Sequence, residues 1–177
     1  MLAGGKVMFR DESGAYSEVA RGLKYANGIS LSSDRKLVYV AETMAAMLRV
    51  YERDEFDDLV LKEKVPLRFS PDNINVDPAS GHIYAAGFPL QSEANANLAK
   101  YDGIKHTDVS ASISARISNE TGEDRFFGRN YKVEPVLMDD GNQLFSTTSC
   151  ASDEERGVLL LSGLFTSKGM MDCRMKL

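Results

Sequence analysis

The sequence predicts an all-β fold, and two observations carry this prediction. Apolar and polar residues alternate over short segments, and turn motifs such as "SSDRK", "DPASG" and "MDDGN" separate these segments. The chain also repeats itself, because Ile29 aligns with Ile74 and "VYVA" aligns with "IYAA" at a spacing of 45 residues. Four-stranded units that recur at such a period are typical of the blades of a β-propeller.

The strands are expected in the following order. Two strands, at 6–10 and 16–20, precede the repeat. The first repeat holds strands at 28–32, 37–42, 48–53 and 59–65, and the second holds strands at 74–77, 82–86, 98–102 and 110–117. A third copy, "VEPVLMDDGNQLFSTTS", follows a polar insertion, and its strands are expected at 133–138, 143–148, 158–163 and 170–174.

One segment, "AETMAAMLRVYER", consists largely of good helix formers and favours a helix by propensity alone. We expect strand, turn and strand there instead, because the surrounding repeat requires it.

The strand order predicts an incomplete propeller. The two strands before the first repeat look like the outer half of a blade, and three full blades follow. A closed ring has roughly four to eight blades and removes the exposed edges of its sheets. About three and a half blades cannot close such a ring, so we expect the C-terminal portion of a larger propeller or a shortened version of one.

Composition excludes several classes of protein. The chain has 177 residues, is 43% hydrophobic and carries a net charge of −5, which is ordinary for one soluble domain. No basic patch is expected, so nucleic acid is excluded as a partner. No apolar run approaches the roughly 20 residues that span a bilayer. The first residues, "MLAGGKVMFRDE", lack the pattern of a signal peptide, so a cytosolic or truncated chain is expected.

Cysteine and histidine offer no recognised reactive motif. Cys150 and Cys173 make no disulfide framework or metal spacing and are expected to be free, half-buried thiols. His82 and His106 lie far apart in the sequence, and no Ser-His-Asp, HExxH or glycine-rich phosphate motif occurs.

The start of each repeat carries the candidate site. Asn27 stands just before the innermost strand of one blade, and Asp72 and Asn73 stand at the same point of the next. Their oxygens are hard ligands that suit Ca²⁺, which takes about six to eight oxygens. Gly28 would let the backbone turn tightly beside the ion, and Ile29 and Ile74 would pack between blades. The same residues are also ordinary turn formers whose side chains cap their own backbone.

At this point the sequence resembles a known family. The motifs "YANGISLSSDRKLVYVAE", "LRVYER", "DNINVDPASGHIYAAG" and "GVLLLSGLF…MMDC" resemble the C-terminal half of the serum paraoxonase/arylesterase family, in order and over nearly the whole chain. The resemblance implies a six-bladed β-propeller with a calcium ion deep in its channel. It also implies hydrolysis of lactones, aryl esters and, weakly, organophosphate triesters. Residues 1–177 are then one domain, about three and a half blades of that ring.

The resemblance also implies roles for individual residues. Asn27 in "ANGI", and Asp72 and Asn73 in "DNI", correspond to ligands of the catalytic calcium. The implied mechanism is Lewis-acid polarisation of the substrate carbonyl, with calcium stabilising the oxyanion formed when water attacks. Asp72 is the candidate catalytic residue, as a base or a nucleophile in the same oxygen cluster.

The chain departs from the family's pattern in several places. The other two calcium ligands and the histidine pair of the family lie in its N-terminal half, which has no counterpart here. Phe88 stands where some members carry histidine. Cys173 falls where many members have a cysteine bonded to one near their N-terminus, and no matching cysteine occurs here. Three oxygen donors leave a calcium shell incomplete, so the isolated chain is expected to lack part of the active site.

Two functions compete. The first is a calcium-dependent hydrolase of carboxylic esters or lactones, of arylesterase or paraoxonase type, which takes a small-molecule ester or lactone. The alternative is a non-catalytic half-propeller that binds a partner or associates with itself through open blade edges. Gluconolactonase-like and strictosidine-synthase-like propellers share the architecture but lack this arrangement of motifs.

Overall fold

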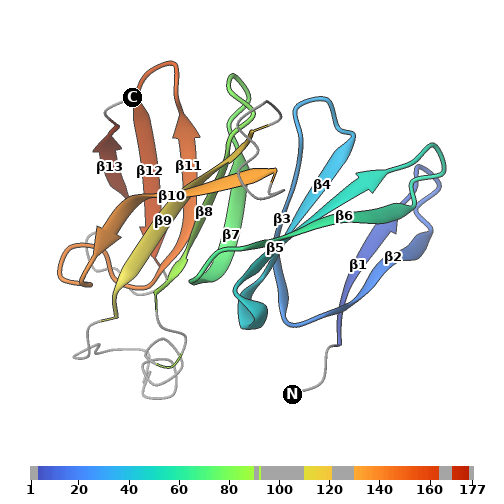
Figure 1. The fold of residues 1–177 in the computed structure, drawn as a ribbon, viewed down its shortest axis with the longest axis horizontal. Coiled ribbons are helices and arrows are strands. Elements are labelled where there is room, and N and C mark those ends of the chain that lie inside the picture. The colour runs from blue at the N-terminus through green and yellow to red at the C-terminus, as the bar shows by residue number, and fades with distance from the viewer. Residues whose placement is uncertain (1–3, 90–91, 93–109, 121–129, 164–168, 176–177) are drawn as a thin grey trace.

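The computed structural model describes residues 4–89, 92, 110–120, 130–163 and 169–175, and over these it forms four antiparallel sheets (Figure 1). The sheets hold the following strands in chain order: β1 (Gly5–Arg10) and β2 (Tyr16–Leu23); β3 (Ala26–Leu31), β4 (Leu37–Glu42), β5 (Met47–Arg53) and β6 (Leu59–Pro66); β7 (Ser70–Val76), β8 (Ile83–Phe88), β9 (Ser112–Asn119) and β10 (Tyr131–Asp139); β11 (Thr147–Asp153), β12 (Val158–Gly163) and β13 (Met171–Arg174). The predicted all-β class is therefore confirmed.

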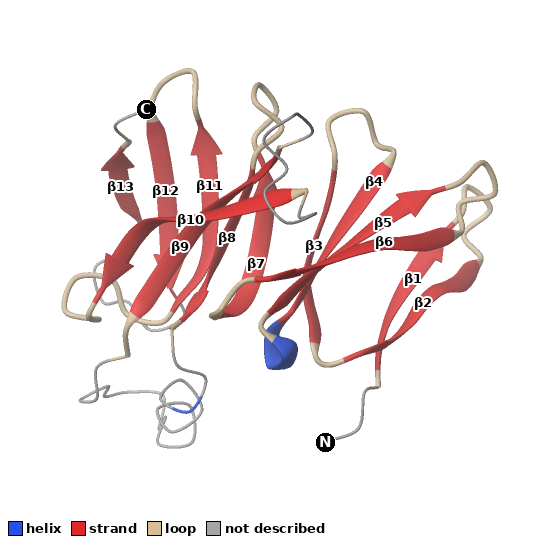
Figure 2. Ribbon diagram, in the orientation of Figure 1, coloured by secondary structure: helices blue, strands red, loops and turns tan. Residues whose placement is uncertain are grey.

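The segment that favoured a helix by propensity forms strand, turn and strand, as the repeat predicted. Only a short 3₁₀ helix at Thr43–Ala45 separates β4 from β5 (Figure 2). It ends at Ala46, whose φ of 50° is left-handed and turns the chain back into β5. Among the described residues, no helix is long and apolar enough to cross a membrane.

The third repeat begins one strand later than predicted. The segment at 133–138 does not open a new sheet but belongs to β10, the outer strand of the β7–β10 sheet. The last sheet starts at β11 and has three strands among the described residues. β10 is half exposed and carries Pro135 at a register shift, both of which suit an edge strand. The strand predicted at 98–102 lies outside the described residues.

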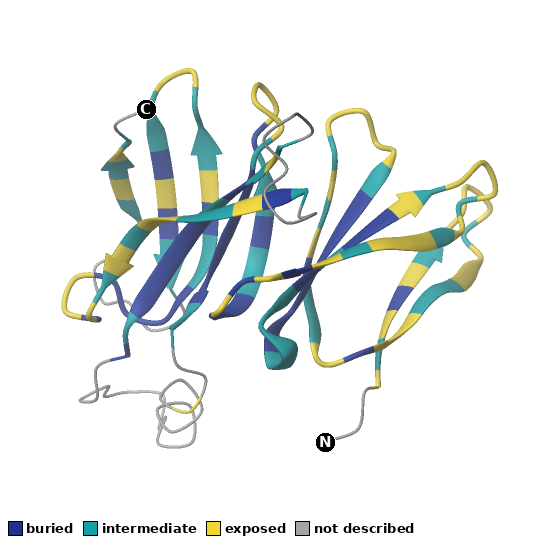
Figure 3. Cartoon of the chain, viewed as in Figure 1, coloured by how far each residue is buried: buried dark blue, intermediate teal, exposed yellow. Residues whose placement is uncertain are grey.

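Apolar side chains fill the spaces between neighbouring sheets, and β4, β8 and most of β9 are buried on both faces (Figure 3). On β4, Val38 and Val40 face the β1–β2 sheet, whereas Tyr39 and Ala41 face the β7–β10 sheet. Successive residues of a strand point to opposite faces. This two-sided burial explains why "VYVA" and "IYAA" are continuous apolar runs rather than alternating ones.

The two repeat-related isoleucines differ in burial. Ile74 is only 8% exposed and packs in the core between the two four-stranded sheets, as predicted. Ile29 is 54% exposed, so the prediction that it packs between blades was wrong. The sheet on its side of β3 contains only β1 and β2 among the described residues, and no strand of that sheet covers Ile29.

Candidate functional site

The residues at the start of each repeat lie in β-bulges. Asn27 and Gly28 fall in a register shift of β3 against β4, and Asp72 and Asn73 fall in the equivalent shift of β7 against β8. A further shift in β11 leaves Thr148 unpaired in the ladder. A bulge re-aims side chains that would otherwise alternate across the sheet. Since β7 contacts both β3 and β11, the three bulges belong to neighbouring first strands.

Gly28 permits the close approach of β3 and β7. A Cβ atom at this position would lie 2.6 Å from the carbonyl oxygen of Asp72 and 2.7 Å from the amide nitrogen of Ile74. These are backbone atoms that cannot swing away, so a side chain here would separate the strands. Gly28 was expected to serve a tight turn beside an ion, but its structural role is this backbone contact.

The carboxamide of Asn27 is tied to both neighbouring elements. Its Nδ2 donates a hydrogen bond to the Thr43 hydroxyl at 3.2 Å. That hydroxyl in turn donates to the carbonyl oxygen of Pro71 at 2.6 Å. The Asn27 amide also lies close enough to the carboxyl group of Asp72 to lower the pKa of that group. The structure therefore brings Asn27 of β3 and Asp72 of β7 into contact.

Asn73 is oriented by β11. Its Nδ2 donates to the carbonyl oxygen of Thr148 at 2.8 Å and to the Ser149 hydroxyl at 3.0 Å. Because a carbonyl oxygen can only accept hydrogen bonds, the amide must turn its NH₂ group toward β11. The Oδ1 atom of Asn73 then faces away from Thr148.

The arrangement leaves oxygen atoms uncommitted. Within the described part of the chain, no hydrogen bond reaches Oδ1 of Asn27 or of Asn73, whereas both amide nitrogens are engaged. With the Asp72 carboxylate, these atoms make a donor set of hard oxygens, which fits Ca²⁺ better than a softer metal. The described residues contain no group of three or more His, Cys, Asp or Glu side chains that could hold a metal. A cation here would depend on the two amides as well as on Asp72.

Burial raises the pKa of Asp72, and the nearby amide of Asn27 offsets this only in part. Burial disfavours the charged form of a carboxyl group, and a nearby cation would favour it. The site therefore holds a half-buried carboxylate that a bound cation would stabilise, and which is more basic than an exposed aspartate.

A buried ion pair supports the chain just before Asn27. Glu42 is fully buried and receives hydrogen bonds from Nε of Arg49 at 2.6 Å and from the backbone N–H of Lys24 at 2.5 Å. Burial alone would raise the pKa of Glu42, but these hydrogen bonds and the positive charges outweigh it and lower the pKa. The pair anchors the entry of the chain into β3.

Sequence reasoning missed the residues that orient the site. Thr43 binds Asn27 from within the same sheet, 16 residues along the chain, whereas Thr148 and Ser149 bind Asn73 from the neighbouring sheet. The equivalent residue of the next repeat is Phe88, so comparison of the repeats does not single out Thr43. For Thr148 a signal exists, because it stands at the start of a strand as Asn27 and Asp72 do, but the predicted third repeat begins one strand too early.

Both cysteines are free, as expected, and neither is a nucleophile of the site. Cys150 is buried, which raises the pKa of its thiol to about 11, and Cys173 is half-buried. A thiol with a raised pKa is almost wholly protonated at neutral pH and therefore unreactive.

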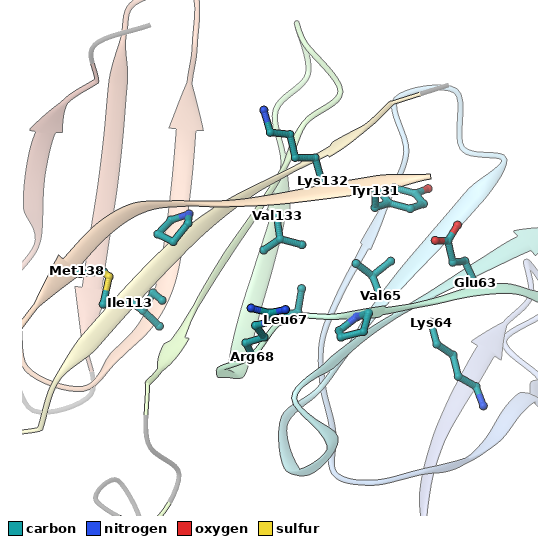
Figure 4. Close-up of a pocket in the computed structure, with 12 residues that line it drawn as sticks. Glu63, Lys64, Val65, Leu67, Arg68, Ile113, Tyr131, Lys132, Val133 and Met138 are labelled. Carbon is teal, nitrogen blue, oxygen red and sulfur yellow. The ribbon is translucent and has the colours of Figure 1, made fainter. Parts of the chain in front are cut away.

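A cavity lies away from these residues. About 730 Å³ of space opens between β6 and β10, where Val65, Leu67 and Val133 lie close together (Figure 4). Lys64 and Lys132 point away from these apolar side chains (Figure 4). None of the predicted site residues borders this cavity, so it offers no direct route to the Asp72 carboxylate.

The sequence matches known proteins over most of its length. The sequence model of the arylesterase family matches residues 2–172. Human serum paraoxonase/lactonase 3 is 41% identical over 147 residues, which is 83% of this chain and 37% of that protein. Human serum paraoxonase/arylesterase 1 is 31% identical, and rabbit (Oryctolagus cuniculus) serum paraoxonase/lactonase 3 is 32% identical, over the same shares. The chain thus spans less than two fifths of the curated relatives it matches.

The fold is also similar to that of solved propeller-type enzymes. A luciferin-regenerating enzyme superposes with a TM-score of 0.56 at 16% identity, over 94% of this chain and 47% of that protein. This likeness concerns the fold alone, whereas the sequence comparisons identify the family. The chain belongs to the arylesterase (paraoxonase) family.

Proposed function

We propose that this chain is the C-terminal part of a calcium-dependent hydrolase of carboxylic esters and lactones. Asn27, Asp72 and Asn73 are its calcium ligands. The observation that supports the proposal most strongly is the orientation of the two amides, whose nitrogens are engaged and whose oxygens are uncommitted. The relatives' names, paraoxonase, arylesterase and lactonase, supply the reaction class.

The proposal assigns a task to each residue. When bound, calcium would supply Lewis-acid activation of the substrate carbonyl. Asn27 and Asn73 would contribute amide oxygens, and Asp72 the only carboxylate of the three. Because burial raises its pKa, Asp72 would also accept a proton from water more readily than an exposed aspartate does. Three oxygens fill about half of a calcium shell, so water or groups beyond the described residues would complete it.

The proposal includes the architecture. Residues 1–177 form one domain, and the four sheets are about three and a half blades of a six-bladed ring. The sheet topology and the likeness to propeller-type enzymes support this reading. In such a ring the bulged starts of β3, β7 and β11 would line the central channel.

The test is hydrolysis of a lactone and an aryl ester by the complete reading frame that contains this chain, with calcium and with excess chelator. We expect activity that chelator abolishes and that Asp72→Ala lowers by about 100-fold or more, the range for loss of a proton-transfer group. Asp34→Asn, which alters a carboxylate in the β3–β4 turn, is the matched control. Hydrolysis that persists in chelator and in Asp72→Ala would contradict the proposal.

A second function, self-association, is favoured by the exposed face of β3. Ile29 and Leu31 are 54% and 42% exposed there, and they border a cavity of about 290 Å³ against β1 and β2. Exposed apolar patches beside open sheet edges commonly mark interaction sites.

Sedimentation velocity over a range of concentrations tests this second function. Self-association of the chain should weaken in Ile29→Ser and persist in Phe56→Ser, which alters a more exposed residue in the β5–β6 turn. A chain that stays monomeric at every concentration would exclude it.

A further inference from the structure

We infer that Thr43 is a positioning residue that fixes the orientation of the Asn27 carboxamide at the candidate calcium site. This inference rests on the proposed function, but its main readout does not require calcium. Thr43 is 4% exposed and directly follows β4. Its hydroxyl lies between Asn27 of β3 and Pro71 of β7, the residue just before Asp72.

The direction of the two hydrogen bonds follows from the number of protons available. A hydroxyl carries one proton, and the carbonyl oxygen of Pro71 can only accept, so the Thr43 proton goes to Pro71 at 2.6 Å. Toward Asn27 the hydroxyl can then only accept, which requires the NH₂ end of the carboxamide at 3.2 Å. The flipped carboxamide would set its oxygen against the hydroxyl oxygen. Thr43 thus selects one of two orientations of nearly equal shape and leaves Oδ1 for a cation.

The backbone around Thr43 holds the hydroxyl in place. The N–H of Thr43 donates to the carbonyl oxygen of Tyr25 at 3.1 Å, and the N–H of Met44 donates to that of Lys24 at 3.2 Å. The buried carboxylate of Glu42 takes the N–H of Lys24. The segment is therefore fastened to the residues just before Asn27, and the hydroxyl joins this unit to β7.

The local strand geometry does not itself require a hydroxyl here. Phe88 stands 45 residues later, at the equivalent point of the next repeat, and has none. The hydroxyl of Thr43 therefore serves the contact between β3 and β7 rather than the turn that follows β4.

The test compares Thr43→Val, which keeps the shape and removes the hydroxyl, with Thr43→Ser, which keeps the hydroxyl. In the calcium-free chain, NMR of the Asn27 side-chain NH₂ group should show two resolved resonances that are protected from exchange with solvent. Thr43→Val should lose this protection, and Thr43→Ser should retain it. If Thr43→Val does not fold, Thr43→Ala replaces it. Unchanged protection in the variant without the hydroxyl would overturn the inference.

Calcium titration calorimetry is the second readout. Thr43→Val should weaken calcium binding about tenfold, the effect expected when a group that orients a metal ligand is lost, and Thr43→Ser should bind nearly as the parent chain does. If Thr43→Val binds calcium with wild-type affinity, the proposed role of Thr43 is overturned. If Asp72→Asn has lost binding in the same experiment, the proposed calcium site is still supported. If the parent chain binds no calcium, the proposed function fails, and the NMR comparison still decides the role of Thr43.

Discussion

At the scale of single residues, the candidate site places a charge where the fold alone would not favour one. Asp72 is half-buried, and the group that lowers the pKa of its carboxyl is the neutral amide of Asn27. Burial without a countercharge favours the protonated carboxyl group. Such a residue is more easily explained by a ligand than by the packing around it, because groups at functional sites are often held in environments that destabilise them.

Replacement of Asp72 by asparagine should therefore stabilise the calcium-free chain at neutral pH. The folded-state pKa of Asp72 is raised above its ordinary 3.8, so its charged form weakens folding once the pH exceeds that value. The stability difference between Asp72→Asn and the parent should grow as the pH rises through the raised pKa and then level off. Urea unfolding in chelator at several pH values measures this difference. A variant that is less stable at neutral pH would contradict the account.

The Glu42–Arg49 pair gives the opposite case, a buried charge that is well partnered. Replacing Arg49 by methionine would strand the Glu42 carboxylate and should cost about 3–5 kcal/mol of the free energy of unfolding. Because the pKa of Glu42 is lowered, the stabilisation is present above its ordinary 4.5 and is lost as the pH falls through the folded-state pKa. The deficit of Arg49→Met should therefore shrink in acid.

The control for Arg49→Met is an ion pair of the same chemistry at the surface. Lys62 and Glu52 are 2.8 Å apart, but both side chains are about half exposed. Replacing Lys62 by methionine should change stability by less than about 1 kcal/mol. Equal losses for the two variants would show that burial of Glu42 does not set the strength of its pair.

At the scale of strands, the site depends on how closely β3 and β7 approach. Gly28→Ala would place a methyl group against the backbone of β7, which cannot yield without separating the strands. Loss of about 1–3 kcal/mol is expected, as for other overpacked positions. In Gly4→Ala the added methyl meets nothing within 4 Å, and its effect should stay within about 0.5 kcal/mol. Urea unfolding of both variants provides the measurement, and similar stability of the two would contradict the close approach.

The sequence allowed some of these strands to be predicted and not others. "VYVA" and "IYAA" identify β4 and β8 because burial on both faces leaves an unbroken apolar run. The assignment of β10 to the third repeat was wrong, because a long polar insertion precedes this strand in the sequence. The alternation of Lys132 and Glu134 with apolar residues is typical of any half-exposed strand and does not identify its sheet. The order of strands across such an insertion depends on pairing that local pattern does not encode.

The same limit applies to the site. Asn27, Asp72 and Asn73 could be singled out because the bulge that carries them recurs with the repeat. Thr43 could not, since the next repeat has Phe88 at the equivalent position and the bond from Thr43 to Pro71 exists only when the two four-stranded sheets pack together. The exposure of Ile29 could not be predicted from the repeat either. The equivalent residue, Ile74, is buried by a four-stranded sheet, whereas Ile29 faces the sheet that contains β1 and β2.

At the scale of the whole molecule, the sheets pack on one another through three apolar cores (Figure 3). The core between the two four-stranded sheets includes Ile74, which follows Asn73 directly on β7. The arrangement of Asn27 against Asp72 thus depends on how these two sheets pack.

The most direct test of the calcium site is a titration of the calcium-free chain with CaCl₂, followed by the backbone amide and asparagine side-chain resonances. We expect saturable shifts that centre on Asn27, Gly28, Asp72 and Asn73, with much smaller shifts in MgCl₂, because magnesium demands a stricter geometry. Asp72→Asn should abolish them. Shifts confined to the acidic turn at 54–58, or no shifts at all, would contradict the account.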